Sequence, residues 1–250
     1  MTSETKFRGI TRRELGFLAG PAVLRHRLFP KAEETLCGIT FRTPRYGFRE
    51  SGRRFVVLHG DEDTARSVLT DYMNDHAGEA LIVTGRERNV ELLGAKIDPN
   101  RLFSRVGAEK SLRAQNPGLP DSRVEAVLAF LDKERGFLLR RLLPPAGGRL
   151  FALHNNREYS VLDEVAASDR TSLREPQSPR NFFLCTDPKD FELLSKSPFN
   201  VVLQSKPDPD DGSLSRLAAK LGFRYINLEC PVGDYEGQLL LVRWLEDRMA

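Results

Sequence analysis

Apolar and polar residues alternate along this chain in two patterns that predict different elements. Short apolar runs bounded by Gly, Pro, Asp or Asn predict β-strands. Longer stretches in which apolar residues recur three and four positions apart, as at Val124, Val127, Leu128 and Leu131, predict helices. The eight predicted strands cover residues 38–42, 55–58, 80–83, 90–97, 150–153, 182–185, 201–204 and 225–228. The predicted helices cover residues 63–75, 122–139, 189–195, 214–221 and 237–248.

This alternation predicts the α/β class, with a mixed, largely parallel sheet covered by helices on both faces. The last predicted helix should turn Leu240, Leu241, Trp244 and Leu245 toward the sheet. The polar stretch at residues 167–180 predicts an exposed insertion. Ligands of such sheets bind beyond the carboxyl ends of the strands, so candidate functional residues are expected at these ends.

The N-terminal part of the chain resembles an export signal. Arg12 and Arg13 precede the apolar residues 15–24, which is the order of a twin-arginine signal. The alternative is an amphipathic surface helix led by two solvated arginines. Both interpretations divide the chain into an N-terminal segment, residues 1–36, and one domain, residues 37–250. With a functional signal the protein would be periplasmic or secreted, and without one it would be cytoplasmic.

Composition and charge exclude several classes of function. The chain has 250 residues, which suits a single hydrophobic core. Its 38 basic and 35 acidic side chains give a net charge of +3, so no nucleic-acid partner is expected. The longest apolar stretch has about half the length of a bilayer-spanning helix, so no membrane span is predicted. Cys37, Cys185 and Cys230 are too few for a disulfide framework, and we expect buried thiols, with one bridge allowed if the protein is exported.

Two strand ends deliver residues that could bind a metal ion. The strand at 55–58 runs directly into the motif HGDE, whose His59 and Glu62 can aim a ring nitrogen and a carboxylate at one point. His154 follows the strand at 150–153 and reaches the same edge of the sheet. Each histidine alone could be a hydrogen-bonded core residue or a cap. Together the three favour zinc, with a fourth position left open to water as in zinc hydrolases.

Two further strand ends carry candidate polar residues. Asn100 and Arg101 follow the strand at 90–97 and could present an amide and a planar guanidinium to a carboxylate. The same residues also suit an ordinary turn. Glu229 ends the strand at 225–228 and could be a general base beside a metal. A capping or salt-bridged glutamate is the alternative.

The order of these residues along the chain resembles the zinc carboxypeptidase family. The motifs HGDE at 59–62 and DPNRLF at 98–103 are also similar to those of its aspartoacylase and succinylglutamate desuccinylase branch. The resemblance spans residues 55–246 and implies an α/β/α sandwich around a mixed, largely parallel eight-stranded sheet. It implies His59, Glu62 and His154 as ligands of Zn2+.

The resemblance implies roles for the remaining candidates as well. Glu229 would be the general base and later the proton donor to the leaving amine, while Asn100 and Arg101 would receive the substrate's free carboxylate. The family also uses an upstream arginine against the oxyanion, for which Arg86 and Arg88 are both candidates. Two features depart from the family pattern. No tyrosine matches the one that caps the substrate, and the stretch after the base leaves no room for the separate C-terminal domain of the aspartoacylase branch.

The expected function is therefore that of a zinc-dependent hydrolase that cleaves an amide bond near a free carboxylate. A metallocarboxypeptidase or peptide amidase would act on peptides, with peptidoglycan peptides as the substrate if the protein is exported. The first alternative is a deacylase of N-acyl amino acids, as in the desuccinylase branch. The second is a non-catalytic domain that binds a metal or a peptide.

Overall fold

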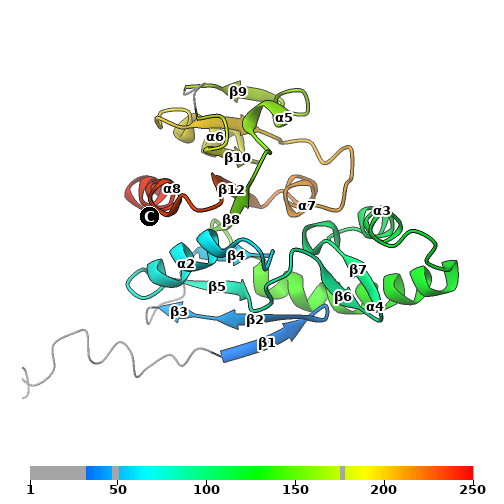
Figure 1. Ribbon diagram of the computed structural model, residues 1–250. Coiled ribbons are helices and arrows are strands. Elements are labelled where there is room, and N and C mark those ends of the chain that lie inside the picture. The colour runs from blue at the N-terminus through cyan, green and yellow to red at the C-terminus, as the bar shows by residue number, and fades with distance from the viewer. Residues whose placement is uncertain (1–31, 47–50, 175–177, 250) are drawn as a thin grey trace, which may run out of the picture.

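The computed structural model describes residues 32–46, 51–174 and 178–249. Within these ranges a mixed sheet of ten strands runs through the centre of the molecule (Figure 1). Its strands are β1 (Ala32–Leu36), β2 (Ile39–Thr43), β3 (Arg45–Tyr46), β4 (Arg53–Val57), β5 (Gly78–Val83), β8 (Arg149–Asn156), β9 (Arg170–Ser172), β10 (Phe182–Cys185), β11 (Asn200–Leu203) and β12 (Arg224–Pro231). They follow the order β1-β2-β5-β4-β8-β12-β10-β11-β9, and β3 pairs with β5 beside β2.

The centre of the sheet is parallel, and antiparallel pairs flank it. Strands β5, β4, β8 and β12 pair in parallel, as do β10 and β11. Antiparallel pairs attach β1, β2 and β3 on one side, and they join β12 to β10 and β11 to β9 on the other. The predicted α/β class with a mixed sheet is confirmed. Because β4, β8 and β12 are parallel neighbours, their carboxyl ends meet at one edge.

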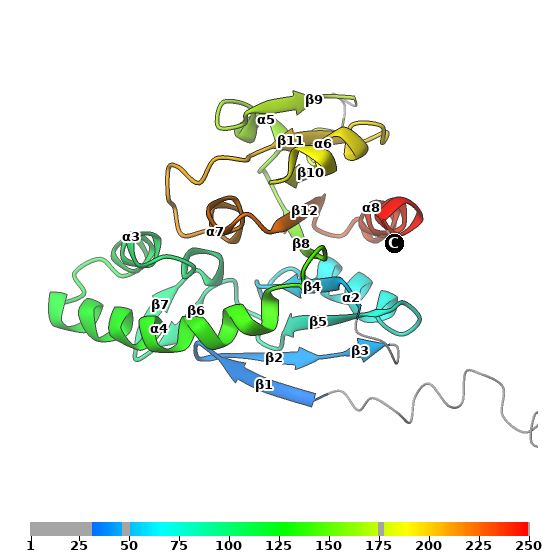
Figure 2. The same ribbon diagram turned by 180° about the vertical axis from the view of Figure 1, so that it is seen from behind.

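Helices cover both faces of this sheet (Figures 1 and 2). One face carries α2 (Asp63–Tyr72), α6 (Pro188–Leu194) and α8 (Tyr235–Met249). The other carries α4 (Asp121–Leu142) and α7 (Leu214–Leu221). The molecule is thus a three-layer sandwich, as expected.

Each central strand contributes to two hydrophobic cores. Phe55 and Val57 pack on the side of α2 and α8, whereas Val56 packs on the side of α4. Successive side chains of a strand point to opposite faces, so a strand covered on both faces must be apolar at every position. This requirement explains the continuous apolar runs from which the central strands were predicted.

Residues 90–97 form a hairpin instead of the single predicted strand. β6 (Val90–Leu92) and β7 (Ala95–Ile97) pair as a separate two-stranded sheet. Leu93 and Gly94 reverse the chain between them with positive φ angles of 50° and 78°, as two-residue hairpin turns require. The hairpin lies beside α3 (Arg105–Gln115), which packs on α4.

Seven of the eight predicted strands belong to the main sheet, and β1, β3 and β9 were not predicted, so this sheet has ten strands in the described residues. β9 lies within residues 167–180, where the polar composition predicts an exposed insertion. β1 lies within the segment 1–36, so the folded structure includes Ala32–Leu36 and does not begin at residue 37. The twin-arginine-like residues 11–24 fall outside the described residues.

Several side-chain predictions can be compared with the structure. In α8, Leu241 and Leu245 are buried, but Leu240 is 54% exposed, because it lies about 100° around the helix from Leu241. The three cysteines are buried free thiols, as predicted, and burial raises the pKa of Cys37 to about 12. None of the helices in the described ranges is long and apolar enough to cross a membrane.

Candidate metal centre and cavity

The carboxyl ends of β4, β8 and β12 place the candidate residues together. His59 follows β4, Glu62 is the N-cap residue of α2, His154 lies in β8, and Glu229 lies in β12. Glu229 is in register with His154 on the neighbouring parallel strand, so both side chains point to the same face. All four are buried, with exposed fractions between 2% and 6%.

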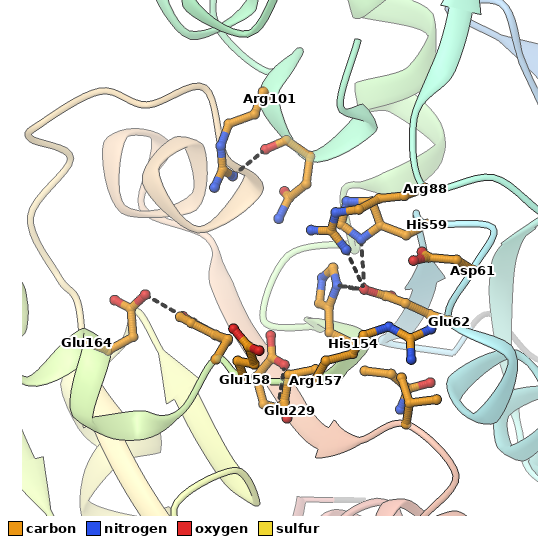
Figure 3. Close-up of a pocket in the computed structure, with 15 residues that line it drawn as sticks. His59, Asp61, Glu62, Arg88, Arg101, His154, Arg157, Glu158, Glu164 and Glu229 are labelled. Atoms are coloured by element: carbon orange, nitrogen blue, oxygen red, sulfur yellow. Dashed lines mark hydrogen bonds and ion pairs between the residues drawn. The ribbon is translucent and has the colours of Figure 1, made fainter. Parts of the chain in front are cut away.

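His59, Glu62 and His154 form a compact group of potential metal ligands. One atom of each lies within 4.8 Å of the others. Nδ1 of His59 is 2.8 Å and Nδ1 of His154 is 3.2 Å from Glu62 Oε1 (Figure 3). Two imidazoles and a carboxylate are the donors that zinc takes in catalytic sites. The three residues therefore fit a zinc ion, and they would supply three of its four ligands.

The electrostatics of the group favour a bound cation. Burial alone would raise the pKa of Glu62, but the two histidines outweigh it and lower this pKa to about 2. Burial would lower the pKa of His59, but the carboxylates of Glu62 and Asp98 outweigh it and raise this pKa to about 9. The carboxylates of Glu62 and Asp98 thus stabilise positive charge at His59, which is the charge a metal ion would bring.

Local contacts free the Glu62 side chain for this role. Glu62 stands at the start of α2, yet its carboxylate makes no capping hydrogen bond there. Asn155 of β8 supplies one instead, because its Oδ1 accepts from the Ala65 amide at 2.8 Å. Gly60 packs so tightly that a Cβ atom would lie 2.6 Å from the backbone oxygens of Gly85 and Glu87. This close approach brings the loop after β5 against the HGDE motif.

Asp98 is a functional candidate that the sequence did not single out. Its Oδ1 lies 2.9 Å from His59 Nε2 and also accepts the Asn100 amide at 2.7 Å. A carboxylate that accepts from Nε2–H fixes the tautomer of the ring and leaves Nδ1 free to bind a metal. Burial opposes ionisation of Asp98, but the bond to His59 outweighs it and lowers its pKa. The signal in the sequence that could have pointed to Asp98 is its place as the first residue of the motif DPNRLF.

Two asparagines hold the carboxylate of Glu229. Asn156 Nδ2 donates to Oε2 and Asn227 Nδ2 donates to Oε1, each at 3.1 Å. Burial raises the pKa of Glu229, with the Glu62 charge acting in the same direction. A carboxylate of raised pKa is better suited to accept and return a proton near neutral pH. Neither asparagine was predicted. Asn156 lies two residues after His154 in β8, and Asn227 lies two residues before Glu229 in β12.

These residues open onto one cavity of about 460 Å³ (Figure 3). Asn100 and Arg101 are among the residues that line it. The Arg101 guanidinium is 38% exposed and donates to the Asn100 carbonyl at 2.8 Å. Asn100 Oδ1 accepts the Leu214 amide at 3.0 Å, so this side chain ties the motif to the start of α7. The other lining residues are His59, Asp61, Glu62, Arg88, His154, Asn155, Asn156, Arg157, Glu158, Tyr159, Glu164, Glu229 and Val232.

The structure separates the two candidate arginines. Arg88 lines the cavity, with its guanidinium 3.7 Å from Glu62 and 3.9 Å from Asp98. Both arginines are exposed, but Arg86 is not among the lining residues. Tyr159 and Glu164, which follow β8 in the chain, also line the cavity and were not predicted. No pattern in the sequence connects these two residues with the strand ends.

The sequence matches no protein-family model and no curated protein. Solved structures similar to this chain include a candidate metallopeptidase from Shewanella baltica OS155, with a TM-score of 0.45 and 13% identity over 87% of this chain and 86% of that chain. A succinylglutamate desuccinylase from Silicibacter sp. TM1040 has a TM-score of 0.44 and 13% identity over 84% of this chain and 60% of that chain. An N-formylglutamate amidohydrolase from Ralstonia eutropha JMP134 has a TM-score of 0.40 and 15% identity over 84% and 98% of the two chains. The roles of individual residues rest on the geometry described above.

Proposed function

We propose that this protein is a zinc-dependent hydrolase that cleaves an amide bond close to a free carboxylate of its substrate. One observation carries this proposal. A buried group of two histidines and a glutamate lines the same cavity as Glu229, which lies in register with His154 on the next strand. A metal-binding group and a neighbouring proton acceptor are the two parts that hydrolysis of an amide requires.

The residues of the chain take complementary parts in this reaction. A zinc ion held by His59, Glu62 and His154 would polarise the scissile carbonyl and lower the pKa of a water ligand to about 7. Glu229 takes a proton from the attacking water and later donates it to the leaving amine. Asn156 and Asn227 hold its carboxylate in place for both transfers.

Two arginines that line the cavity bind the two negatively charged groups of the substrate, its free carboxylate and its developing oxyanion. Arg101 binds the free carboxylate, because a guanidinium offers two parallel donors to that group. Arg88 meets the charge that develops on the carbonyl oxygen, a contribution of about 3 kcal/mol for one donor in other enzymes. Arg88 is favoured over Arg86 because its guanidinium lies 3.7 Å from Glu62 and it lines the cavity, whereas Arg86 does not.

Peptides and N-acyl amino acids both combine a scissile amide with a carboxylate, so both are substrate classes for this site. A carboxypeptidase or peptide amidase is the first candidate activity, and a deacylase of N-acyl amino acids is the second. Export to the periplasm and action on peptidoglycan peptides depend on the N-terminal segment, and they stay predictions.

Metal content tests the ligand assignment. We expect about one zinc per chain after dialysis against a weak chelator, measured by elemental analysis, and loss of zinc in the double variant His59→Ala, His154→Ala. His76→Ala is the matched control, because His76 lies outside the group and stacks on Tyr72. A wild-type protein that takes up no zinc even after reconstitution would contradict the proposal.

Hydrolysis tests the role of Glu229. We expect Glu229→Gln to keep its zinc and to lose at least about 100-fold in kcat/KM, which is the contribution of a general base. Glu236→Gln, an exposed residue on α8, should leave hydrolysis unchanged. The assay would screen C-terminal peptides alongside N-acetyl, N-formyl and N-succinyl amino acids. If the zinc-loaded wild type cleaves none of them, the protein is instead a metal- or peptide-binding domain.

A further inference from the structure

Glu164 is a carboxylate on the cavity wall that the proposed reaction does not use. It lies in the short helix α5 (Val161–Val165) and lines the same cavity as His154 and Glu229. In Figure 3 Arg101 and Glu164 both lie to the left of His59 and Glu62, with Arg101 above and Glu164 below. Because Arg101 and Glu164 line the same cavity as the three candidate metal ligands, a substrate that fills this cavity can contact both residues.

Neutral donors hold both oxygens of this carboxylate. The Tyr159 hydroxyl donates to Oε1, and the amide of the buried Gln204 donates to Oε2. Burial raises the pKa of Tyr159, and the negative charges of Glu229 and Glu164 raise it further, so this hydroxyl keeps its proton. The carboxylate is thus fixed in position before any ligand binds.

The helix that carries Glu164 is itself anchored. Ser160 and Asp163 form a capping box at its start, in which the Ser160 amide donates to Asp163 at 2.8 Å. The Val161 amide donates to the Pro179 carbonyl at 2.8 Å. A charged group held on a fixed element binds a ligand without an added cost of ordering.

The hydrogen-bond partners of the Glu164 carboxylate in the described part of the chain are both uncharged. Among the described residues, no lysine or arginine forms an ion pair with it. Arg157 lines the same cavity, but Figure 3 shows its side chain directed toward the Glu62 side. A half-buried carboxylate with neutral partners gains most from a ligand that brings a cation, because charge-assisted hydrogen bonds are stronger than neutral ones.

We propose that Glu164 binds a cationic group of the substrate, and that the substrate is an amide of a basic amino acid. Its carboxylate would contact Arg101 while its side-chain ammonium or guanidinium contacts Glu164. This inference rests on the proposed function, since it takes the cavity as the substrate site. The expected substrates are amides in which the part with the free carboxylate also carries a positive charge.

Binding of the product amino acids tests this assignment without any turnover. The ligands are lysine and norleucine, as each enantiomer, because norleucine has the carbon chain of lysine without the ammonium. Titration calorimetry on the zinc-loaded wild type should show at least about tenfold tighter binding of lysine in one enantiomeric series, which equals about 1.4 kcal/mol. Glu164→Gln should lose this preference, because glutamine keeps the size of the side chain and removes its charge.

Glu158→Gln is the matched control, since Glu158 lines the same cavity but is exposed. This variant should keep the preference for lysine. The assignment is overturned if the wild type binds norleucine as tightly as lysine, if it binds neither, or if Glu164→Gln keeps the preference. Zinc content and Glu229-dependent hydrolysis are measured separately. If both hold while the preference is missing, the subsite alone is refuted and the proposed function stands.

Discussion

His59 directs Nδ1 toward Glu62 and Nε2 toward Asp98. The orientation of this ring therefore depends on Asp98, a residue that is not one of the proposed metal ligands. In His154, by contrast, Nε2 is buried without a hydrogen-bond partner. Of the two histidines, His59 alone has a carboxylate on the ring nitrogen that does not face Glu62. At the scale of single residues, Asp98 is the positioning residue of the site.

We predict that Asp98→Asn weakens zinc binding by about 10- to 100-fold, which is the usual cost of removing such a partner. Asparagine keeps an oxygen for the Asn100 amide, so the fold should be retained. Competition with a chelating indicator measures the affinity. Asp63→Asn is the control, because Asp63 adjoins Glu62 but has a side chain that is 75% exposed. Equal affinities of the two variants would show that Asp98 does not position His59.

At the scale of elements, α3 and the loop before α7 meet at two glycines. A Cβ atom on Gly107 would lie 2.2 Å from the backbone of Gly212. The Phe103 amide donates to the Gly212 carbonyl at 3.0 Å, which fastens the same loop to the end of the DPNRLF motif. The approach of these backbones thus positions the segment that carries Asn100 and Arg101.

Gly107→Ala should therefore destabilise the protein by about 1–3 kcal/mol, because the added methyl group must displace backbone atoms. Gly136→Ala in α4 is the matched control. Its nearest neighbour would be the flexible end of Arg140 at 3.6 Å, so we expect a gain of about 0.5–1 kcal/mol from the better helix former. Urea denaturation measures both changes. If Gly107→Ala is as stable as the wild type, the loop that carries Gly212 can move away from the added methyl group without loss of stability.

The elements that the sequence predicted are those with buried surroundings. The central strands are apolar at consecutive positions because both of their faces are covered, and this pattern is visible without a structure. β1 and β9 are polar edge strands whose pairing depends on a neighbour, so their sequences, AEETL and RTS, carry no such pattern. The same contrast holds for the site. His59 and His154 stand at the ends of strong strands, whereas the bonds of Asp98 and Glu164 depend on where distant loops come to lie.

At the scale of the whole molecule, a buried ion group fastens the helix layer to the middle of the sheet. Asp190 of α6 is fully buried and contacts Arg149 of β8 and Arg224 of β12. These two arginines are paired in register at the starts of their strands. They therefore lie at the opposite end of β8 and β12 from His154 and Glu229.

Asp190→Asn should lower the free energy of unfolding by about 3–5 kcal/mol, since it leaves two arginines without their buried counter-charge. Zinc content should not change, because the metal group lies at the other end of the strands. Asp247→Asn, which removes a carboxylate that is 69% exposed, should change stability by less than about 0.5 kcal/mol. Denaturation and elemental analysis of both variants test this separation, and a loss of zinc in folded Asp190→Asn would refute it.

The position of β12 in the sheet has a consequence for how the protein is made. β12 is the last described strand along the chain, yet it lies in the middle of the sheet, between β8 and β10. While the ribosome is still synthesising this part of the chain, β8 and β10 each keep an open edge, and such edges invite pairing with other chains. The strand that carries Glu229 is therefore also the one whose arrival joins the two halves of the nascent sheet. The carboxylate proposed as the general base and the continuous sheet are completed in the same step.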